Sequence, residues 1–163
     1  MIVLGIDPGY AIVGFGIVEY LSNNFKVIDY GVITTEPEKP FSDRLLTVHK
    51  ELDFIIKNHE VDCVCVEELF FNKNTKTAIN VAQVRGAILL TAKLINLPVY
   101  EYTPMQIKQG VVGYGRAEKK QVQEMVRIIL NLKSIPRPDD AADALAAAIS
   151  HCHNINYGKL FKT

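Results

Sequence analysis

The sequence has few cysteines, no long hydrophobic run and no net charge. Three cysteines are too few, and odd in number, for a disulfide framework. No apolar stretch approaches the roughly 20 residues that span a bilayer. The start of the chain has neither the basic region nor the small-residue cleavage site of a secretory signal peptide. We therefore expect a cytoplasmic protein that does not contact a membrane.

Two of the cysteines, Cys63 and Cys65, alternate with valines in an apolar segment. In such a segment a cysteine is usually a small buried hydrophobic residue. A zinc site could combine the two with His151, Cys152 or His153. The spacing disfavours this site, because Cys-x-Cys is shorter than the separation of two to four residues that zinc ligands usually have.

The zero net charge conceals an uneven distribution of charged residues. Between Leu69 and Arg137 there are eleven Lys and Arg against three Glu, a surplus of eight positive charges. The rest of the chain carries the compensating negative charge. A basic middle section with acids at fixed points favours a polyanion-binding surface around a metal site. A solvated, lysine-rich helix face would explain the composition equally well.

Length and hydrophobic periodicity predict one domain over residues 1–154, followed by a short C-terminal tail at 155–163. Strands are expected at residues 2–6, 12–20, 25–34, 61–66 and 98–102. Helices are expected from an N-cap at Ser42, over residues 75–96 and 122–130, and from about Asp140 onward. Three glycines, Gly110, Gly113 and Gly115, predict a loop before the helix at 122–130. This order indicates an α/β protein with helices on both faces of a mixed five-stranded sheet.

The helix expected at 75–96 is apolar on more than one face. Such a helix either lies centrally in its own core or also packs on a partner. Gly86, near its middle, would let another backbone approach closely.

Four acids stand out by position: Asp7, Glu67, Asp140 and Asp143. Asp7 and Glu67 end two predicted strands, and ligand sites of open α/β sheets form at such ends. Asp140 and Asp143 are three residues apart at the start of the last helix, so their side chains share a face. Converging carboxylates repel one another unless a cation neutralises them, and Mg²⁺ prefers oxygen ligands. One or two such ions could hydrolyse a phosphodiester.

Each acid also has a simpler explanation. Asp140 could be only an N-cap, Asp143 an acid favoured by the helix dipole, and Asp7 a turn former. Glu67 is harder to explain in this way because it follows a wholly apolar strand. Strand alternation alone leaves open whether Glu67 or Glu68 points toward the other acids.

Four segments of the chain resemble the RuvC family of bacterial Holliday-junction resolvases. They are Gly5-Ile6-Asp7-Pro8-Gly9, then Val66-Glu67 with Phe70 close behind, then Ala117-Glu118-Lys119, and finally Asp140-Ala141-Ala142-Asp143-Ala144-Leu145-Ala146. The resemblance implies a ribonuclease-H-like fold and magnesium-dependent hydrolysis, for which Mn²⁺ could substitute. It also implies a homodimer that places paired, symmetric nicks across a four-way junction in recombination and DNA repair. RuvA and RuvB, the branch-migration proteins, are the partners that it suggests.

The resemblance also assigns roles to individual residues. Asp7, Glu67, Asp140 and Asp143 match the metal-binding, catalytic carboxylates, which favours Glu67 over Glu68; some relatives have histidine in place of Asp143. The residues expected to contact DNA are Lys108 and Lys119, Phe70 as a base-stacking aromatic, Phe71 in the same role or in the core, and Lys73, Lys76 and Arg85 at the backbone.

Three other functions compete with junction resolution. A nuclease of the same fold could act on RNA–DNA hybrids or duplex DNA. A junction-binding protein without activity is disfavoured, because four bare carboxylates would repel a phosphate backbone. An actin-like phosphotransferase also opens with a strand, an Asp and a glycine turn, but it needs a second domain for which 163 residues leave no room.

Overall fold

The computed structural model describes residues 1–68 and 75–160, with side chains described at 1–68 and 77–155. The strands are β1 (Ile2–Asp7), β2 (Ile12–Leu21), β3 (Asn24–Thr34), β4 (Cys63–Glu67) and β5 (Val99–Tyr102). The helices are α1 (Phe41–Asn58), α2 (Thr75–Leu94), α3 (Pro104–Val112), α4 (Lys119–Ile129) and α5 (Asp139–Leu160).

The five strands form one mixed sheet in the order β3-β2-β1-β4-β5. The chain opens with an antiparallel meander, in which β2 pairs with both β1 and β3. β4 then pairs in parallel with β1, and β5 pairs in parallel with β4. Because β1 and β4 run in the same direction, their carboxyl ends meet at one edge of the sheet.

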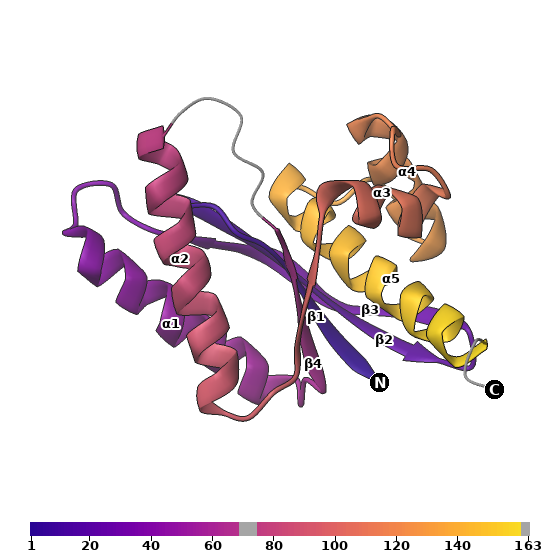
Figure 1. The fold of residues 1–163 in the computed structure, drawn as a ribbon, viewed down its shortest axis with the longest axis horizontal. Coiled ribbons are helices and arrows are strands. Elements are labelled where there is room, and N and C mark those ends of the chain that lie inside the picture. The colour runs from indigo at the N-terminus through magenta and orange to yellow at the C-terminus, as the bar shows by residue number, and fades with distance from the viewer. Residues whose placement is uncertain (69–74, 161–163) are drawn as a thin grey trace.

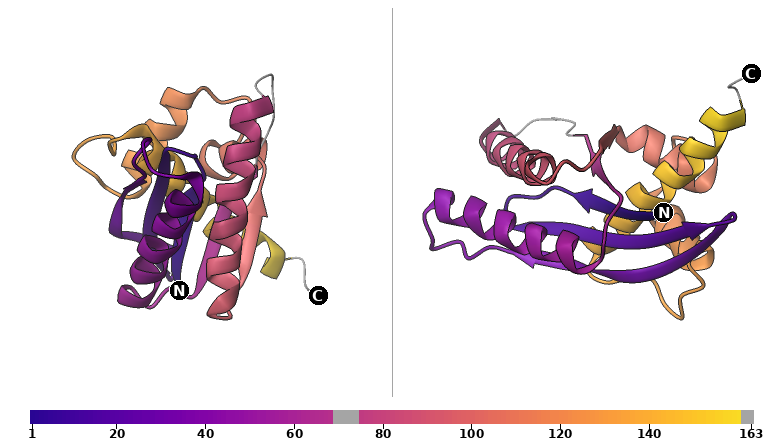
Figure 2. Two further views of the ribbon diagram at one scale, coloured as in Figure 1. Left: turned by 90° about the vertical axis from the view of Figure 1, so that its left-hand side faces the viewer. Right: turned by 90° about the horizontal axis from the view of Figure 1, so that it is seen from below.

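Helices cover both faces of this sheet, as Figure 1 shows. On one face α1 and α2 pack over the aliphatic residues Leu4, Ile6, Val64 and Val66. In the left view of Figure 2 these two helices lie in front of the strands. On the other face α5 crosses β1 and β2, with α3 and α4 packed against it. This arrangement confirms the fold expected from the sequence.

Close packing of α5 depends on small residues in both the helix and the sheet. The buried face of α5 is largely alanine, including Ala141, Ala144 and Ala148. A Cβ atom at Gly5 of β1 would lie 2.0 Å from the carbonyl oxygen of Ala144, and one at Gly14 would lie 2.1 Å from that of Asp140. Side chains at these glycines would therefore push the N-terminal half of α5 off the sheet.

Two local predictions were wrong. Ser42 is not the N-cap of α1: the helix begins at Phe41, and the carbonyl of Pro40 accepts from the backbone of Asp43 and Arg44. The region before Gly113, expected to be a loop, contains helix α3. A capping box starts this helix, because Thr103 Oγ1 accepts from the Gln106 amide while the Gln106 side chain accepts from the Thr103 amide. Gly113 then ends it in a left-handed conformation.

The last helix continues to Leu160, so helical structure extends into residues 155–160 of the expected tail. The expected boundary between the domain and a separate tail stays a prediction. Among the helices in the described part of the chain, none combines the length and apolar character of a membrane span.

The contact between Gly5 and α5 can be tested by Gly5→Ala. We expect this variant to lower the free energy of unfolding by about 1–3 kcal/mol, because the added methyl group overpacks the sheet–helix contact. Gly31→Ala is the control, since a methyl group there meets only side-chain atoms of Phe15, at 3.1 and 3.2 Å, and should cost clearly less than Gly5→Ala. Urea unfolding measures both. A Gly5→Ala variant as stable as the parent would contradict the close approach.

Candidate active site

Asp7 and Glu67 lie side by side at the carboxyl ends of β1 and β4. The register pairs Ile6 with Val66, so the next residue of each strand reaches the same sheet edge. Side chains alternate along a strand, and Cys63 and Cys65 already pack into the α5 side of the core. Glu67 shares their parity and faces α5. Glu68 has the opposite parity and lies beyond the end of β4.

The N-terminal turns of α5 bring the other two acids to this edge. Asp140 and Asp143 both belong to the helix, and the backbone of Asp140 lies directly over Gly14 of β2. Asp7 is within electrostatic reach of Glu67, Asp143 and Asp140, each of which raises its pKa. The structure therefore brings together all four carboxylates singled out in the sequence.

Two lysines adjoin these carboxylates. Lys119, the first residue of α4, places its Nζ 2.8 Å from Asp143 Oδ2 and 3.6 Å from Asp139 Oδ2. Lys108 of α3 lines the same cleft, which has a volume of about 190 Å³. The cleft is lined by Glu67, Pro104, Ile107, Lys108, Lys119, Val122, Asp143 and Ala146. Its lining therefore combines positive, negative and apolar side chains.

Burial and mutual repulsion raise the pKa values of Asp7, Glu67 and Asp143. Burial, followed by the charge of Glu67, raises the pKa of Asp7 to about 8. Burial and the charge of Asp143 raise the pKa of Glu67 to about 7, although Lys119 and Lys108 oppose the shift. Burial also raises the pKa of Asp143, against the opposing hydrogen bond to Lys119. The two lysines therefore balance only part of the negative charge of the site, and a bound cation could neutralise the rest.

The donor set fits a hard divalent cation. It consists of carboxylate oxygens, the ligands that Mg²⁺ and Mn²⁺ prefer. Within the described residues, no three of these carboxylates place ligand atoms within 4.8 Å of one another. Asp143 Oδ2 is instead engaged with Lys119 Nζ, so a metal would bind the other carboxylate oxygen of Asp143 or compete with the lysine.

Sequence reasoning missed one acidic residue, Asp139. Its carboxylate pairs with Arg137 and with Lys119, so it helps to hold the lysine over the cleft. The available signal was its position next to Asp140 at the start of α5, but an acid in the first turn is also common for helix-dipole reasons.

The remaining residues expected to contact DNA are less completely placed. Phe70, Phe71 and Lys73 lie outside the described residues. Lys76 lies in the first turn of α2, and its side chain is also outside the described part. Arg85, further along α2, forms an ion pair with Glu101 of β5. The DNA-binding roles of these residues stay predictions.

The strand order and the acidic edge between β1, β4 and α5 define a metal-dependent nuclease of the ribonuclease-H-like fold. Residues 3–151 match the family described as crossover junction endodeoxyribonuclease RuvC. The RuvC of Clostridioides difficile (strain 630) is 59% identical over 162 residues, which cover 99% of this chain and 96% of that protein. The chain therefore belongs to the RuvC family of crossover junction endodeoxyribonucleases.

Solved structures agree with this assignment. The structure of Thermus thermophilus RuvC in complex with a Holliday junction substrate has a TM-score of 0.92 and 38% identity, covering 97% of this chain and 96% of that chain. The yeast mitochondrial Holliday junction resolvase Ydc2 is 13% identical, with a TM-score of 0.73 over 98% of this chain and 81% of that chain, and it supports the fold alone. Family, fold and enzyme class are therefore confirmed, and an actin-like phosphotransferase is excluded.

The raised pKa of Asp7 predicts how stability depends on pH in metal-free buffer. Its ordinary value is 3.8 and its folded value about 8, so the unfolded chain loses this proton first as the pH rises. The free energy of unfolding should therefore fall between about pH 4 and pH 8. Asp7→Asn should be more stable than the parent at pH 8, by at least about 1.4 kcal/mol, and close to it at pH 4.

Urea unfolding of the parent and of Asp7→Asn, at several pH values in the presence of a chelator, measures this difference. Adding Mg²⁺ should recover the stability lost by the parent at pH 8. Parallel pH profiles for the two proteins would contradict the assigned burial and repulsion at Asp7.

Proposed function

We propose that this chain resolves four-way DNA junctions by magnesium-dependent hydrolysis of two symmetrically placed phosphodiester bonds, in homologous recombination and DNA repair. The observation that carries the proposal is the convergence of carboxylates from β1, β4 and α5 beside two lysines in one cleft. Carboxylates supply a cation site, and lysines supply positive charge for the phosphate. Neither group alone would favour phosphodiester hydrolysis as strongly as the two together.

Asp7, Glu67, Asp140 and Asp143 would hold one or two Mg²⁺ ions, and Mn²⁺ is expected to substitute because it shares the preference for oxygen. When bound, the metal supplies an activated water and neutralises charge on the scissile phosphate. The protons that Asp7 and Glu67 retain near neutral pH must leave as the site is occupied. Activity is therefore expected to rise with pH through the region of their pKa values, about 7 and about 8.

Lys119 is proposed to act directly on the substrate. Its side chain is about half exposed while its Nζ contacts Asp143, so it can contact the carboxylates and an incoming phosphate in turn. A lysine placed there stabilises negative charge as the phosphorus–oxygen bond breaks. Lys108, which lines the same cleft, is proposed to position a phosphate oxygen.

A junction substrate is supported by the family and by the related T. thermophilus protein, which was solved with a Holliday junction. Phe70 and Phe71 are proposed to stack on bases unpaired at the crossover, with a contribution of about 1–3 kcal/mol per base. Lys73 and Lys76 are proposed to contact the DNA backbone. Arg85 can do so only if it releases Glu101.

A homodimer is supported by the outer face of α2. Ile79, Leu90 and Leu94 are exposed there, and their spacing places them on the same side of the helix as Gly86. The opposite side carries Val84 and Ile88, which are buried against the sheet. We propose that α2 packs on its counterpart in a second subunit, with Gly86 admitting the partner backbone.

The dimer is tested by Leu90→Glu. A charge at this exposed apolar position should convert the protein to a monomer in sedimentation equilibrium, with an unchanged circular dichroism spectrum. Lys120→Glu, a charge change at an exposed position of α4 outside this face, is the control and should stay dimeric. A Leu90→Glu variant that remains dimeric would move the interface elsewhere.

Contact with RuvA and RuvB and a cytoplasmic location are further proposals that rest on family membership. Retention of the purified chain on immobilised RuvB at a junction tests the first. Cell fractionation tests the second.

Cleavage of an end-labelled four-way junction in Mg²⁺ tests the function as a whole. We expect paired nicks at symmetric positions, little cutting of linear duplex, RNA–DNA hybrid or single strand, and no cutting by Asp7→Asn despite retained junction binding. Preferential cutting of hybrid or duplex would identify a different nuclease of this fold. Tight junction binding without cutting by the parent would indicate a binding protein.

Within the same assay, Lys119→Ala should reduce the single-turnover rate by about 100-fold or more, the range for loss of one group that stabilises transition-state charge. Lys120→Ala is the matched control, because it removes the same charge from the next exposed position of α4. Equal rates for Lys119→Ala and Lys120→Ala would remove Lys119 from the mechanism.

A further inference from the structure

A second group of metal-ligating side chains lies inside the core, away from the carboxylates. Cys63 and Cys65 of β4 and His151 of α5 are all buried, and their ligand atoms lie within 4.8 Å of one another. His151 follows Asp143 by eight residues, which is about 12 Å along the helix. The proposed nuclease mechanism uses none of these three residues.

The spacing of the ligand atoms suits a tetrahedral metal. Zinc binds thiolate sulfur at about 2.3 Å and imidazole nitrogen at about 2.0–2.1 Å, so a tetrahedral angle separates the two ligands by about 3.5 Å. The distance from Cys63 Sγ to His151 Nε2 is 3.5 Å. The Cys-x-Cys spacing that disfavoured zinc in the sequence places both side chains on one face of a strand. The extended backbone of β4 therefore brings the two thiols to the same side, as a longer loop between the ligands does in common zinc sites.

The imidazole of His151 is held in the orientation that metal binding requires. Its Nδ1 lies 2.7 Å from the hydroxyl oxygen of Tyr102, and its ring lies 4.3 Å from that of Tyr100 between ring centres. When Nδ1–H donates to Tyr102, the lone pair of Nε2 points at the thiols. Metal-binding histidines are typically fixed by a partner on the other ring nitrogen in this way.

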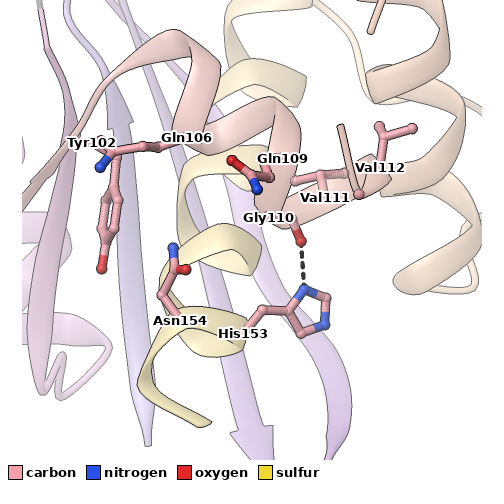
Figure 3. Close-up of a pocket in the computed structure, with 9 residues that line it drawn as sticks. Tyr102, Gln106, Gln109, Gly110, Val111, Val112, His153 and Asn154 are labelled. Atoms are coloured by element: carbon pink, nitrogen blue, oxygen red, sulfur yellow. Dashed lines mark hydrogen bonds between the residues drawn. The ribbon is translucent and has the colours of Figure 1, made fainter. Parts of the chain in front are cut away.

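Charge also favours an ion at this position. Two thiolates balance a divalent cation, so the buried site would be neutral overall and would avoid the penalty of an unpaired charge. A pocket of about 720 Å³ lies beside the cluster, lined by Tyr102 and by residues of α3 and α5. Figure 3 shows Tyr102, Gln106, His153 and Asn154 around this space. Because Tyr102 also contacts His151, a single side chain links the lining of this pocket to the cluster.

We propose that Cys63, Cys65 and His151 form a structural site for a thiolate-preferring divalent cation, represented by Zn²⁺. Binding releases the thiol protons and joins β4 to α5 through three metal–ligand bonds. Those two elements carry Glu67 and Asp143. The site would therefore fix the relative position of two carboxylates of the nuclease centre without contacting substrate.

Cobalt substitution tests the proposal. Metal-free full-length protein, held in excess Mg²⁺ to occupy the oxygen ligands, is titrated with Co²⁺ under anaerobic conditions. We expect a near-ultraviolet thiolate-to-cobalt charge-transfer band that saturates at one Co²⁺ per chain and disappears when Zn²⁺ is added. Cobalt bound by carboxylates alone cannot give this band. Its absence from the parent protein would overturn the proposal, whatever the variants do.

Variants then assign the ligands. Cys63→Ala and Cys65→Ala, which keep small apolar side chains in the core, should each lose the charge-transfer band. Cys152→Ala is the matched control, because it removes the third buried thiol, next to His151 but outside the group. It should keep the band. A band that survives in both Cys63→Ala and Cys65→Ala, or that Cys152→Ala loses equally, would overturn this ligand set.

Tyr102→Phe tests the role of the hydrogen bond on His151. Loss of such a partner typically weakens metal affinity by about 10- to 100-fold, so competition with a chelator should show a shift of that size for Zn²⁺. In the same excess of Mg²⁺, Zn²⁺ should also raise the thermal unfolding temperature of the parent, since it binds the folded state, and should have no such effect on Cys63→Ala. An unfolding temperature raised equally in both proteins would place the ion elsewhere.

Discussion

The contact between α5 and strands β1 and β2 is the constraint on which the rest of the molecule depends. Alanines of the helix meet glycines of the sheet, so that backbone packs nearly on backbone. Because the separation is so small, Asp140 and Asp143 lie beside the end of β1 rather than a side chain's length above it. The same contact helps to bury Asp7. The packing of small apolar residues thus determines where the acidic side chains of the site lie.

This placement leaves the acidic edge under electrostatic strain. Burial and mutual repulsion favour protonated Asp7 and Glu67, and Lys119 offsets only part of the repulsion. A divalent cation offsets both effects at once. Metal binding is therefore favoured by the repulsion that folding creates among these carboxylates. The lysine then becomes available to a phosphate as its carboxylate partners turn to the metal. Metal, lysine and substrate are therefore coupled through one set of charges.

Most of the fold could be predicted from the sequence, because strong patterns specified it. The valine-rich strand before Glu67 and the alanine-rich helix after Asp140 are such patterns, and the meander followed from alternation and a polar turn. Helix α3 was missed because three glycines predicted a loop, although Thr103 and Gln106 form a capping box at its start. The acids of the site were found because each ends a strand or begins a helix. The pairing of Lys119 with Asp143 depends on how α4 packs against α5, and no local pattern encodes that contact.

Strand β4 has a property that follows from its alternation. One face of the strand carries Cys63, Cys65 and Glu67, and the other carries Val64 and Val66. Side chains therefore alternate with a period of two residues. A substitution alters one group at a time. Removing or adding a single residue within the strand would move the side chains on one side of the change to the opposite face of the sheet. The thiols or the carboxylate would then face α1 and α2, and valines would face α5. Differences in chain length among functional relatives should therefore fall in the connections on either side of β4, never inside it.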